Sequence, residues 1–386
     1  MKIAFCISSD TRSGIEFVMK SLNERHWEVT VFLNKESVLI NDFLQDGYRI
    51  VTVDNSDFTT ESLLKLYHLL EEFGCVLYDH HSIVRNFADR LKRRMEFNIS
   101  PRFHPTFDYP NPNFNDAYIP AGFNKVSYSL IKLIEDLKKQ ELNQFRKELP
   151  INDQSSPIPS IYGISATLLN KPKDYPLNSY FTGVWINTER TSCPDALNPY
   201  FGEKKLLIIL NTPSIKTVVP FLRWCSEICN ELHVQPIVIN KSKEADSTQY
   251  LIDGRLAFIK NAPEDAIPFV DAVIHAEDYH VSMNCLYHGK PALAYTTKGN
   301  LNLDDRFWRD QAFMSGCALK PIHLTSVTRK DLKNNIEVLI GEHLPVHHRC
   351  AEMAHKLKTE DGVKKATDLI ELYFSMSFHL TQHAVS

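Results

Sequence analysis

The fold is decided by residues 2–33, which read KIAFCI at Lys2–Ile7, IEFVMKSLN at Ile15–Asn23 and WEVTVFL at Trp27–Leu33. The first and third segments are short apolar runs rich in β-branched and aromatic residues, as is typical of buried strands. In the middle segment, apolar side chains recur every three or four residues, which predicts an amphipathic helix. A strand, a helix and a second strand in this order predict a parallel pair with a crossover helix.

The same alternation continues along most of the chain. It predicts further strands at Tyr48–Val53 and Cys75–Tyr78, and it restarts after a polar stretch over 186–204. The strands predicted there are Leu206–Leu210, Gln235–Ile239, Leu256–Ile259, Ala272–His275 and Ala292–Tyr295. We therefore predict an α/β protein with two Rossmann-like domains. A long helical pattern over 345–382 ends the chain, and Gly362 inside it predicts a break.

The composition is that of an ordinary globular protein. Its 43 Lys and Arg against 47 Asp and Glu give a net charge of −4, so the basic surface of a dedicated nucleic-acid binder is not expected. With 13 glycines in 386 residues, glycine stands at about half its usual share of roughly 7%, and glycine-rich phosphate loops are scarce. The 8 cysteines include no C-x-x-C pair, so we expect a reduced, cytoplasmic protein.

Four segments carry a resemblance to a known family. They are Phe123–Leu149 (FNKVSYSLIKLIEDLKKQELNQFRKEL), Ile161–Trp185 (IYGISATLLNKPKDYPLNSYFTGVW), Asp304–Trp308 (DDRFW) and Lys358–Glu371 (KTEDGVKKATDLIE). In this order they resemble segments of UDP-glycosyltransferases of the bacterial sterol-glucosyltransferase-like branch. The resemblance implies the GT-B fold, with two Rossmann-like domains facing each other across a cleft. It implies an acceptor-binding domain over 1–190, a linker over 191–205, a nucleotide-sugar-binding domain over 206–360 and a final helix over 361–386 that returns to the first domain.

The resemblance also implies a reaction. An inverting glycosyltransferase moves a hexose from a nucleotide-sugar, a UDP-sugar in the first place, to a hydroxyl of a hydrophobic or secondary-metabolite acceptor. No metal and no cofactor are expected, because the nucleotide-sugar is a co-substrate. The expected partners are the nucleotide-sugar and a small-molecule or lipid acceptor, not nucleic acid, and a peripheral membrane contact is left open. The alternative is a catalytically impaired GT-B protein that acts as a binding partner or chaperone of another enzyme.

The reaction needs a base that takes the proton of the acceptor hydroxyl. Asp10 follows the first strand, where the family places its base, and is the first candidate; it would otherwise cap the next helix. Asp79, His80 and His81 follow the strand Cys75–Tyr78 and supply a second candidate. A histidine paired with a carboxylate is a common base near neutral pH, so either histidine could take this role, with Asp79 orienting it.

The donor-binding candidates lie in the second half of the chain. By the resemblance, Thr212 takes the place of a diphosphate-binding serine, His275 takes the first histidine position of the donor loop, and Asp304 and Asp305 bind sugar hydroxyls. His280 and Ser282, at the start of a predicted helix, are partial substitutes for the missing phosphate ligand. The loop itself departs from the family pattern, because Ala276 replaces the phosphate-binding histidine and Glu277 and Asp278 replace glycines. These carboxylates predict weak donor binding that strengthens toward pH 6 as His275 or His280 gains a proton.

The acceptor-binding candidates are aromatic residues of a loop over 101–122 that holds five prolines. The residues are Phe103, Phe107, Tyr109 and Phe114. An apolar pocket of this kind suits a hydrophobic acceptor, whereas the plain alternative is that these rings only pin the loop to the domain.

Overall fold

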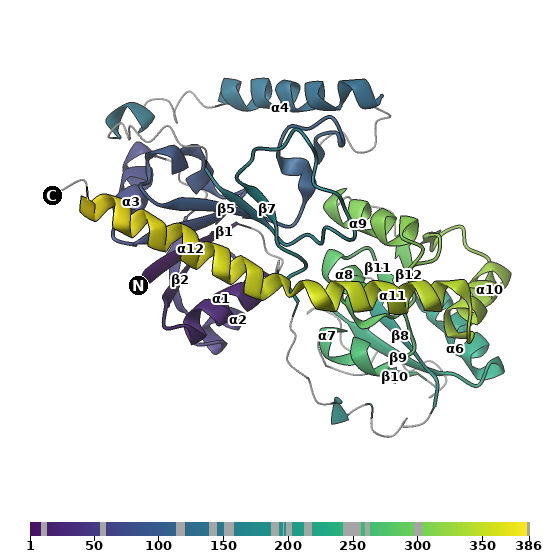
Figure 1. Cartoon of the computed structure of the whole chain (residues 1–386). Helices are drawn as coiled ribbons and strands as arrows, with labels where there is room; N and C mark the ends of the chain where they lie inside the picture. Colours follow the sequence, from purple (N-terminus) through teal and green to yellow (C-terminus); the bar gives the residue numbers. More distant parts are fainter. Residues whose placement is uncertain are drawn as a thin grey trace. The chain divides into compact units, whose positions relative to one another are not determined.

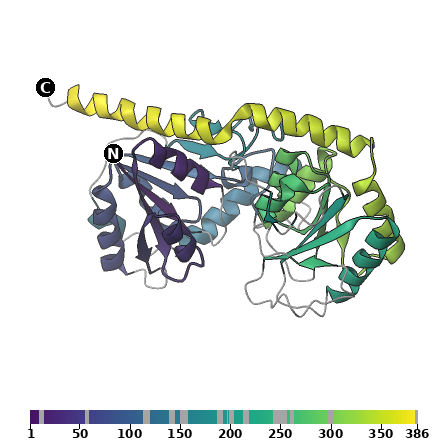
Figure 2. The same cartoon turned by 90° about the horizontal axis from the view of Figure 1, so that it is seen from below.

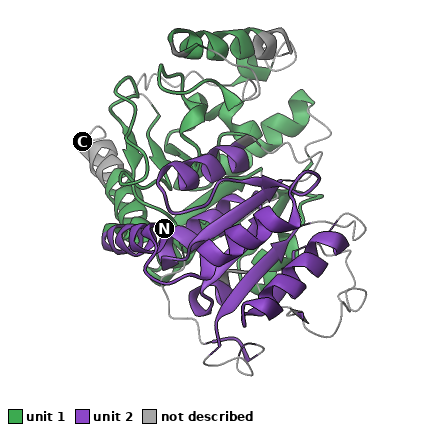
Figure 3. Cartoon of the chain, turned by 90° about the vertical axis from the view of Figure 1, so that its right-hand side faces the viewer, with its two compact units in different colours: residues 1–187, 360–386 green, residues 188–359 purple. Residues whose placement is uncertain are grey.

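The chain forms two compact units in the computed structural model. One holds residues 1–187 and 360–386 and the other residues 188–359 (Figure 3). The residues described are 1–8, 14–54, 59–112, 120–138, 145–149, 158–186, 193–195, 197, 203–211, 218–241, 256–258, 263–296 and 303–383. Each unit is built on one parallel sheet, so the predicted α/β fold with two Rossmann-like domains is confirmed.

Unit 1 contains a seven-stranded sheet in the order β3-β2-β1-β4-β5-β6-β7, and each pairing is parallel. Its strands are β1 (Lys2–Ile7), β2 (Glu28–Asn34), β3 (Arg49–Val53), β4 (Cys75–Asp79), β5 (Arg94–Asn98), β6 (Ser160–Tyr162) and β7 (Ser179–Phe181). Its helices include α1 (Ile15–Glu24), α2 (Ile40–Gln45), α3 (Thr60–Glu71), α4 (Asn124–Lys138) and α12 (Gly362–His383) (Figure 1).

Strand β1 is apolar along its length because both of its faces are covered. Ile3 and Phe5 point into a core shared with α1 and α12, while Ala4 and Cys6 belong to a second core with α3. Since neighbouring side chains of a strand point to opposite faces, this continuous apolar run is what a helix-covered parallel sheet requires. Helix α12 lies beside α1, far from it in sequence (Figure 2).

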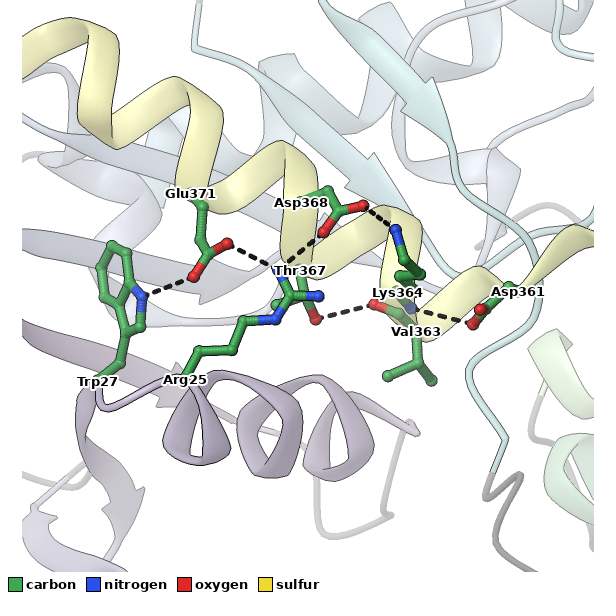
Figure 4. Close-up of polar contacts among 8 residues, drawn as sticks. All are labelled: Arg25, Trp27, Asp361, Val363, Lys364, Thr367, Asp368 and Glu371. Atoms are coloured by element: carbon green, nitrogen blue, oxygen red, sulfur yellow. Dashed lines mark hydrogen bonds and ion pairs between the residues drawn. The ribbon is translucent and has the colours of Figure 1, made fainter.

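One residue, Asp361, separates α12 from the helix before it. Helix α11 (Pro345–Glu360) ends there, and Asp361 has the left-handed φ of 48° before α12 begins at Gly362. Helix α12 is then held to α1 by charge as well as by packing (Figure 4). Arg25 donates to Asp368 and to Glu371, both at 2.7 Å, and Trp27 Nε1 donates to Glu371 at 3.0 Å.

Gly362 is predicted to tolerate no side chain. A Cβ at this position would lie 2.4 Å from Val184 O and 2.5 Å from the carbonyl carbon of Gly183, so the backbone would have to move. We expect Gly362→Ala to lower the free energy of unfolding by about 2–4 kcal/mol in urea denaturation. Gly122→Ala is the control, because a Cβ there meets nothing within 4 Å. Equal stability of the two variants would contradict this account of the junction.

Unit 2 contains a six-stranded sheet in the order β10-β9-β8-β11-β12-β13, again with parallel pairings. Its strands are β8 (Lys205–Leu210), β9 (Gln235–Asn240), β10 (Ala257–Phe258), β11 (Ala272–Ala276), β12 (Ala292–Thr296) and β13 (Ile322–His323). Its helices include α6 (Val219–Glu231), α7 (Pro263–Ala266), α8 (Tyr279–His288), α9 (Leu303–Met314) and α10 (Arg329–Ile340). Alternate residues of β8 pack on α6 and α10 on one face and on α8 on the other.

Each sheet reverses its strand order at one place. In unit 1 the chain proceeds outward from β1 to β3 and then resumes on the other side with β4, and in unit 2 the reversal lies between β8 and β11. Ligands of open parallel sheets bind at the carboxyl ends of the strands at such a switch point. The candidate sites therefore lie at the switch points, beside Ser8 and Asp79 in unit 1 and beside Asn211 and Glu277 in unit 2.

Candidate functional site

The switch point of unit 1 is held together by Asp79. Its carboxylate accepts hydrogen bonds from Ser8 N at 2.6 Å, from Ser8 Oγ, and from the backbone N–H of His81 at 3.0 Å. Burial raises the pKa of Asp79, and these hydrogen bonds oppose the rise. Asp79 thus joins the ends of β1 and β4. The expected contact between Asp79 and a histidine ring is replaced by these contacts to Ser8 and to the backbone.

The histidine ring is paired instead with Glu96 of the neighbouring strand β5. Nδ1 of His80 lies 3.1 Å from Glu96 Oε1, and only 15% of the His80 side chain and 9% of the Glu96 side chain are exposed. The ring of Phe103 stacks on His80 with a centroid distance of 4.2 Å and an interplanar angle of 13°. A carboxylate on one edge and an aromatic ring on one face fix the orientation of the imidazole.

The two groups hold different charges at neutral pH. Burial lowers the pKa of His80 to about 4, although Glu96 opposes the shift. Burial alone would raise the pKa of Glu96, but its hydrogen bond to His80 and the nearby charges lower it to about 2. Glu96 is therefore ionised and His80 neutral. With Nδ1–H donating to the carboxylate, Nε2 carries the free lone pair, and the ring is able to accept a proton.

A second layer of polar side chains supports Glu96. Asn98 Nδ2 donates to Glu96 Oε1 at 3.2 Å, and Asn98 pairs across the sheet with Tyr162 of β6. The Tyr162 hydroxyl contacts Nδ1 of His104, whose pKa is lowered by burial. Glu96 and Asn98 are polar residues on one face of a buried strand, and sequence reasoning missed them. The alternation of apolar and polar residues in RMEFN was the available signal.

The aromatic residues that are predicted to bind the acceptor lie in different surroundings. Phe103 contacts both His80 and His81, the latter edge-on at 5.1 Å. Phe107 is 55% exposed and lies under Lys125 Nζ, 4.6 Å from the ring centroid. Burial raises the pKa of the Tyr109 phenol to about 12, with a smaller effect of Asp108. Asp10 and Phe114 lie outside the described residues.

In unit 2, carboxylates of the chain itself accept hydrogen bonds from N–H groups in the first turn of α8. Asp278 caps the helix by accepting from Val281 N at 3.1 Å and pairs with Lys241 Nζ at 2.6 Å. Tyr279 N donates to Asp305 Oδ1 of α9 at 2.8 Å. Burial would raise the pKa of Asp278, but Lys241, His280 and the capped N–H hold it below its usual value. These are the backbone groups that a bound phosphate would use.

The carboxylates beside this turn, from which weak donor binding is predicted, are each paired with a cation. Glu277 is buried and contacts Arg309 of α9; its pKa is raised by burial against the attraction of Arg309 and Arg306. With Asp278 held by Lys241, each carboxylate has a cationic partner inside unit 2. The repulsion that a phosphate would meet is therefore smaller than unpaired carboxylates would produce.

The other residues that are predicted to bind the nucleotide-sugar differ in how deeply they are buried. His275 is 2% exposed, and its Nδ1 lies 2.6 Å from Ala276 O. Burial lowers the pKa of His275, which opposes the expected protonation of this ring. Ser282 is buried in the first turns of α8, and its Oγ has no hydrogen-bond partner among the described residues. His280 lies in that turn, Asp304 is the second residue of α9, and Thr212 is outside the described residues.

Asp305 makes the stability of unit 2 depend on pH. Burial and the charge of Asp278 raise the pKa of Asp305 to about 7. A raised carboxyl pKa means that the folded state binds the proton more tightly, so this contribution is complete below about pH 4 and is lost as the pH rises through 7. Between pH 5 and 8 we expect Asp305→Asn to remove on the order of 1–2 kcal/mol of the pH dependence measured by urea denaturation. Asp271→Asn, which changes the net charge equally and is not among the groups that shift the pKa of Asp305, should leave that dependence in place.

Comparison with known proteins shows similarity in fold to solved glycosyltransferases and a distant similarity in sequence to one curated protein. No family model matches the chain. A curated relative, UDP-sugar-dependent glycosyltransferase 52 of Dictyostelium discoideum, is 22% identical over 323 residues, which are 72% of this chain and 19% of the relative. The chain therefore spans about a fifth of the length of the curated relative that it matches.

Solved structures match over nearly the whole chain. The spinosyn forosaminyltransferase SpnP has a TM-score of 0.68 at 12% identity, covering 97% of this chain and 99% of its own. The glycosyltransferase of kitacinnamycin has a TM-score of 0.66 at 16% identity, with 97% and 99% covered. SnogD from Streptomyces nogalater has a TM-score of 0.66 at 12% identity, with 96% and 99% covered. The chain thus has the GT-B fold of these glycosyltransferases.

Proposed function

We propose that the chain transfers a glycosyl group from a nucleotide-sugar to a hydroxyl of a hydrophobic acceptor, with His80 as the base. The single observation that supports this most is the pairing of a neutral imidazole with the ionised Glu96 at the switch point of unit 1. Asp10 remains the alternative base. Unit 1 would bind the acceptor, and unit 2 would bind the donor around the N-terminus of α8.

The proposed step is a direct displacement. The acceptor oxygen forms a bond to the anomeric carbon while its proton passes to Nε2 of His80. The bond from that carbon to the diphosphate oxygen breaks, and the nucleoside diphosphate leaves with the electron pair. The configuration at the anomeric carbon is inverted. Lys241 and the N–H groups of α8 would stabilise the charge of the leaving group, which lets the step proceed without a metal or cofactor.

The nucleotide of the donor is proposed from the similar proteins. The curated relative is named for UDP-sugars, whereas VinC, with a TM-score of 0.65 at 10% identity, was solved with dTDP. We propose a UDP-hexose as the first donor to test and TDP-sugars as the second. The test is incubation of the protein with each donor and a panel of hydrophobic alcohols and phenols. Mass spectrometry should then show acceptors that have gained one sugar residue, and their absence for each donor would reject the transferase.

A second function is favoured by the donor loop itself. Asp278 and Asp305 occupy N–H groups of α8, as they would in a GT-B protein that has lost its donor and binds another enzyme. The two functions differ in nucleotide affinity. Calorimetry that detects neither UDP nor TDP binding would support the binding protein, and binding of either would support the transferase.

A further inference from the structure

Helices α9 and α11 of unit 2 bring two thiols together. Both helices belong to the described part of the chain, in which no helix has the length and hydropathy of a membrane span. Cys317 follows the end of α9, and Cys350 lies on α11, so the two residues are far apart in sequence. Cys350 Sγ donates a hydrogen bond to Cys317 O at 3.2 Å. Both side chains are buried free thiols, and the proposed glycosyl transfer uses neither of them.

The local structure fixes the position of each thiol. Gly316, with a φ of 74°, ends α9 in the left-handed conformation, and Cys317 N then donates to Ala312 O at 3.3 Å. Cys350 lies on the buried side of α11. The end of one helix and the inner side of another therefore keep the two thiols adjacent, without a covalent bond between them.

The surroundings favour the thiolate form of Cys317. The hydrogen bond from Cys350 lowers the pKa of Cys317 to about 7; burial and Glu352 oppose this shift, whereas the positive charge of Arg349 supports it. The Arg349 side chain packs on Gly316, where a Cβ would lie 3.1 Å from Arg349 Cζ. The hydrogen bond to Cys317 raises the pKa of Cys350. Because the thiolate is the nucleophile in thiol chemistry, Cys317 is the reactive member of the pair.

Other thiols of unit 2 lack this feature. Cys225 and Cys229 lie one helical turn apart on α6, and both are buried free thiols. Burial raises the pKa of Cys225 well above its ordinary value and that of Cys229 to about 12, so both stay protonated at neutral pH. Burial also raises the pKa of Cys285 on α8. The thiolate at Cys317, and not the closeness of two cysteines alone, therefore distinguishes its pair.

We propose that Cys317 and Cys350 form a reversible disulfide, with a hydroperoxide as the oxidant. The Cys317 thiolate attacks one oxygen of the hydroperoxide, so a sulfur–oxygen bond forms and the oxygen–oxygen bond breaks. The leaving oxygen takes a proton, and Cys317 becomes a sulfenic acid. Cys350 Sγ then attacks that sulfur, and hydroxide leaves with the thiol proton as water. The two sulfurs lose two electrons in total, the hydroperoxide gains them, and a dithiol reverses the reaction.

Burial restricts the oxidant, because only a small molecule such as hydrogen peroxide reaches thiols that are at most 1% exposed. Disulfides of this kind in a reducing compartment are usually transient, which agrees with free thiols in the structure. The oxidant therefore acts on a pair that is reduced in the resting protein.

The disulfide would act as a latch between helices of unit 2. It would join the end of α9 to α11, and α8 meets α11 at the same place, since a Cβ at Gly289 would lie 3.4 Å from Cys350 O. A covalent bond between residues so distant in sequence restricts the unfolded chain and stabilises the folded unit. The latch lies at the C-terminal ends of α8 and α9, whereas the donor-binding candidates Tyr279 and Asp305 lie at their N-terminal ends.

The test is treatment of the full chain with hydrogen peroxide, alkylation of the remaining thiols and mass spectrometry of its peptides without reduction. We expect one peptide pair linked through Cys317 and Cys350, which dithiothreitol separates again. The oxidised protein should also have a Tm about 5–15 °C above that of the reduced protein. Cys317→Ser and Cys350→Ser should each lose the link and the rise in Tm. Cys225→Ser is the matched control, because it removes another buried thiol of unit 2 and should keep both effects.

Several results would overturn the proposal. One is the absence of the link after peroxide treatment, and another is a link from Cys350 to Cys285 in its place. A sulfinic acid at Cys317 beside a free Cys350 would show that the second step does not occur, and an unchanged Tm of the linked protein would contradict the latch. The link and the Tm of the wild type need no substitution, so they decide the matter even where a serine variant fails to fold. Each measurement uses the protein without donor or acceptor, so its outcome is independent of whether glycosyl transfer occurs.

Discussion

His80→Gln is expected to lower turnover by about 10²–10⁴-fold while nucleotide binding stays unchanged. Glutamine keeps a polar side chain of similar reach but has no basic nitrogen, so the proton of the acceptor would have no recipient. His81→Gln is the matched control, since His81 is the exposed neighbour of the same type and has no contact to Glu96 among those described. The measurement is the turnover of both variants and the wild type, with the donor and acceptor that mass spectrometry identifies.

The variant Asp10→Asn tests whether Asp10, and not His80, is the base. If Asp10 takes the proton, Asp10→Asn should show the large loss and His80→Gln should remain active. If Asp10 caps a helix, asparagine serves nearly as well and turnover should persist. A loss with His81→Gln alone would contradict the assignment to His80.

Glu96 is a positioning residue, and its role has a separate signature. Glu96→Gln should lower turnover by about 10–10²-fold, because the ring loses the carboxylate that fixes it. Since Glu96 raises the pKa of His80 against burial, its removal should also move the acidic limb of the kcat/KM profile to lower pH. A purely structural loss would reduce activity without moving that limb.

The strand that carries Glu96 explains why the sequence revealed the fold better than the site. Strands β1 and β4 are continuous apolar runs, and their pattern alone predicts them. Strand β5 (RMEFN) is buried along its length, yet three of its five residues are polar or charged. Such residues lower the apparent strand propensity, and their burial is made favourable by partners outside the strand, such as His80 for Glu96. Contacts between distant segments of this kind leave little local signal.

The donor loop is a second case in which contacts between distant residues leave no signal in the sequence. The sequence indicates that carboxylates replace glycines at 277 and 278, and charge alone then predicts repulsion of a diphosphate. Their cationic partners, Lys241 after β9 and Arg309 on α9, lie more than 30 residues away and follow from the packing of unit 2. The break before α12, in contrast, is predicted by the Gly362 in the pattern, and the structure places it at the left-handed Asp361 directly before that glycine.

Asp278→Asn is expected to tighten nucleoside diphosphate binding about 10- to 100-fold. The carboxylate holds both Lys241 and a backbone N–H of α8, and it would repel a phosphate at this turn. Asparagine still caps the helix but leaves the Lys241 charge uncompensated, and a charge–charge interaction of about 1–3 kcal/mol at this range corresponds to that gain. Lys241→Gln should weaken binding by a comparable factor. Asp271→Asn, an equal change of charge elsewhere in unit 2, should have no effect.

The pH dependence of nucleotide binding tests whether Asp305 changes its charge at the first turn of α8. Asp305, with a pKa raised to about 7, loses its charge as the pH falls from 8 to 6, so nucleotide binding should tighten over that interval. Burial lowers the pKa of His275, which opposes a contribution from that ring. Asp305→Asn should lose the part of this pH dependence that comes from Asp305, while the terminal phosphate of the nucleotide, with a second pKa of about 6, sets the part that remains. Calorimetry with UDP and TDP at the two pH values measures both effects. If Asp278→Asn and the wild type bind with the same affinity, the phosphate lies away from α8. If neither binds, the loop is closed by its own carboxylates, and the chain works as a binding protein.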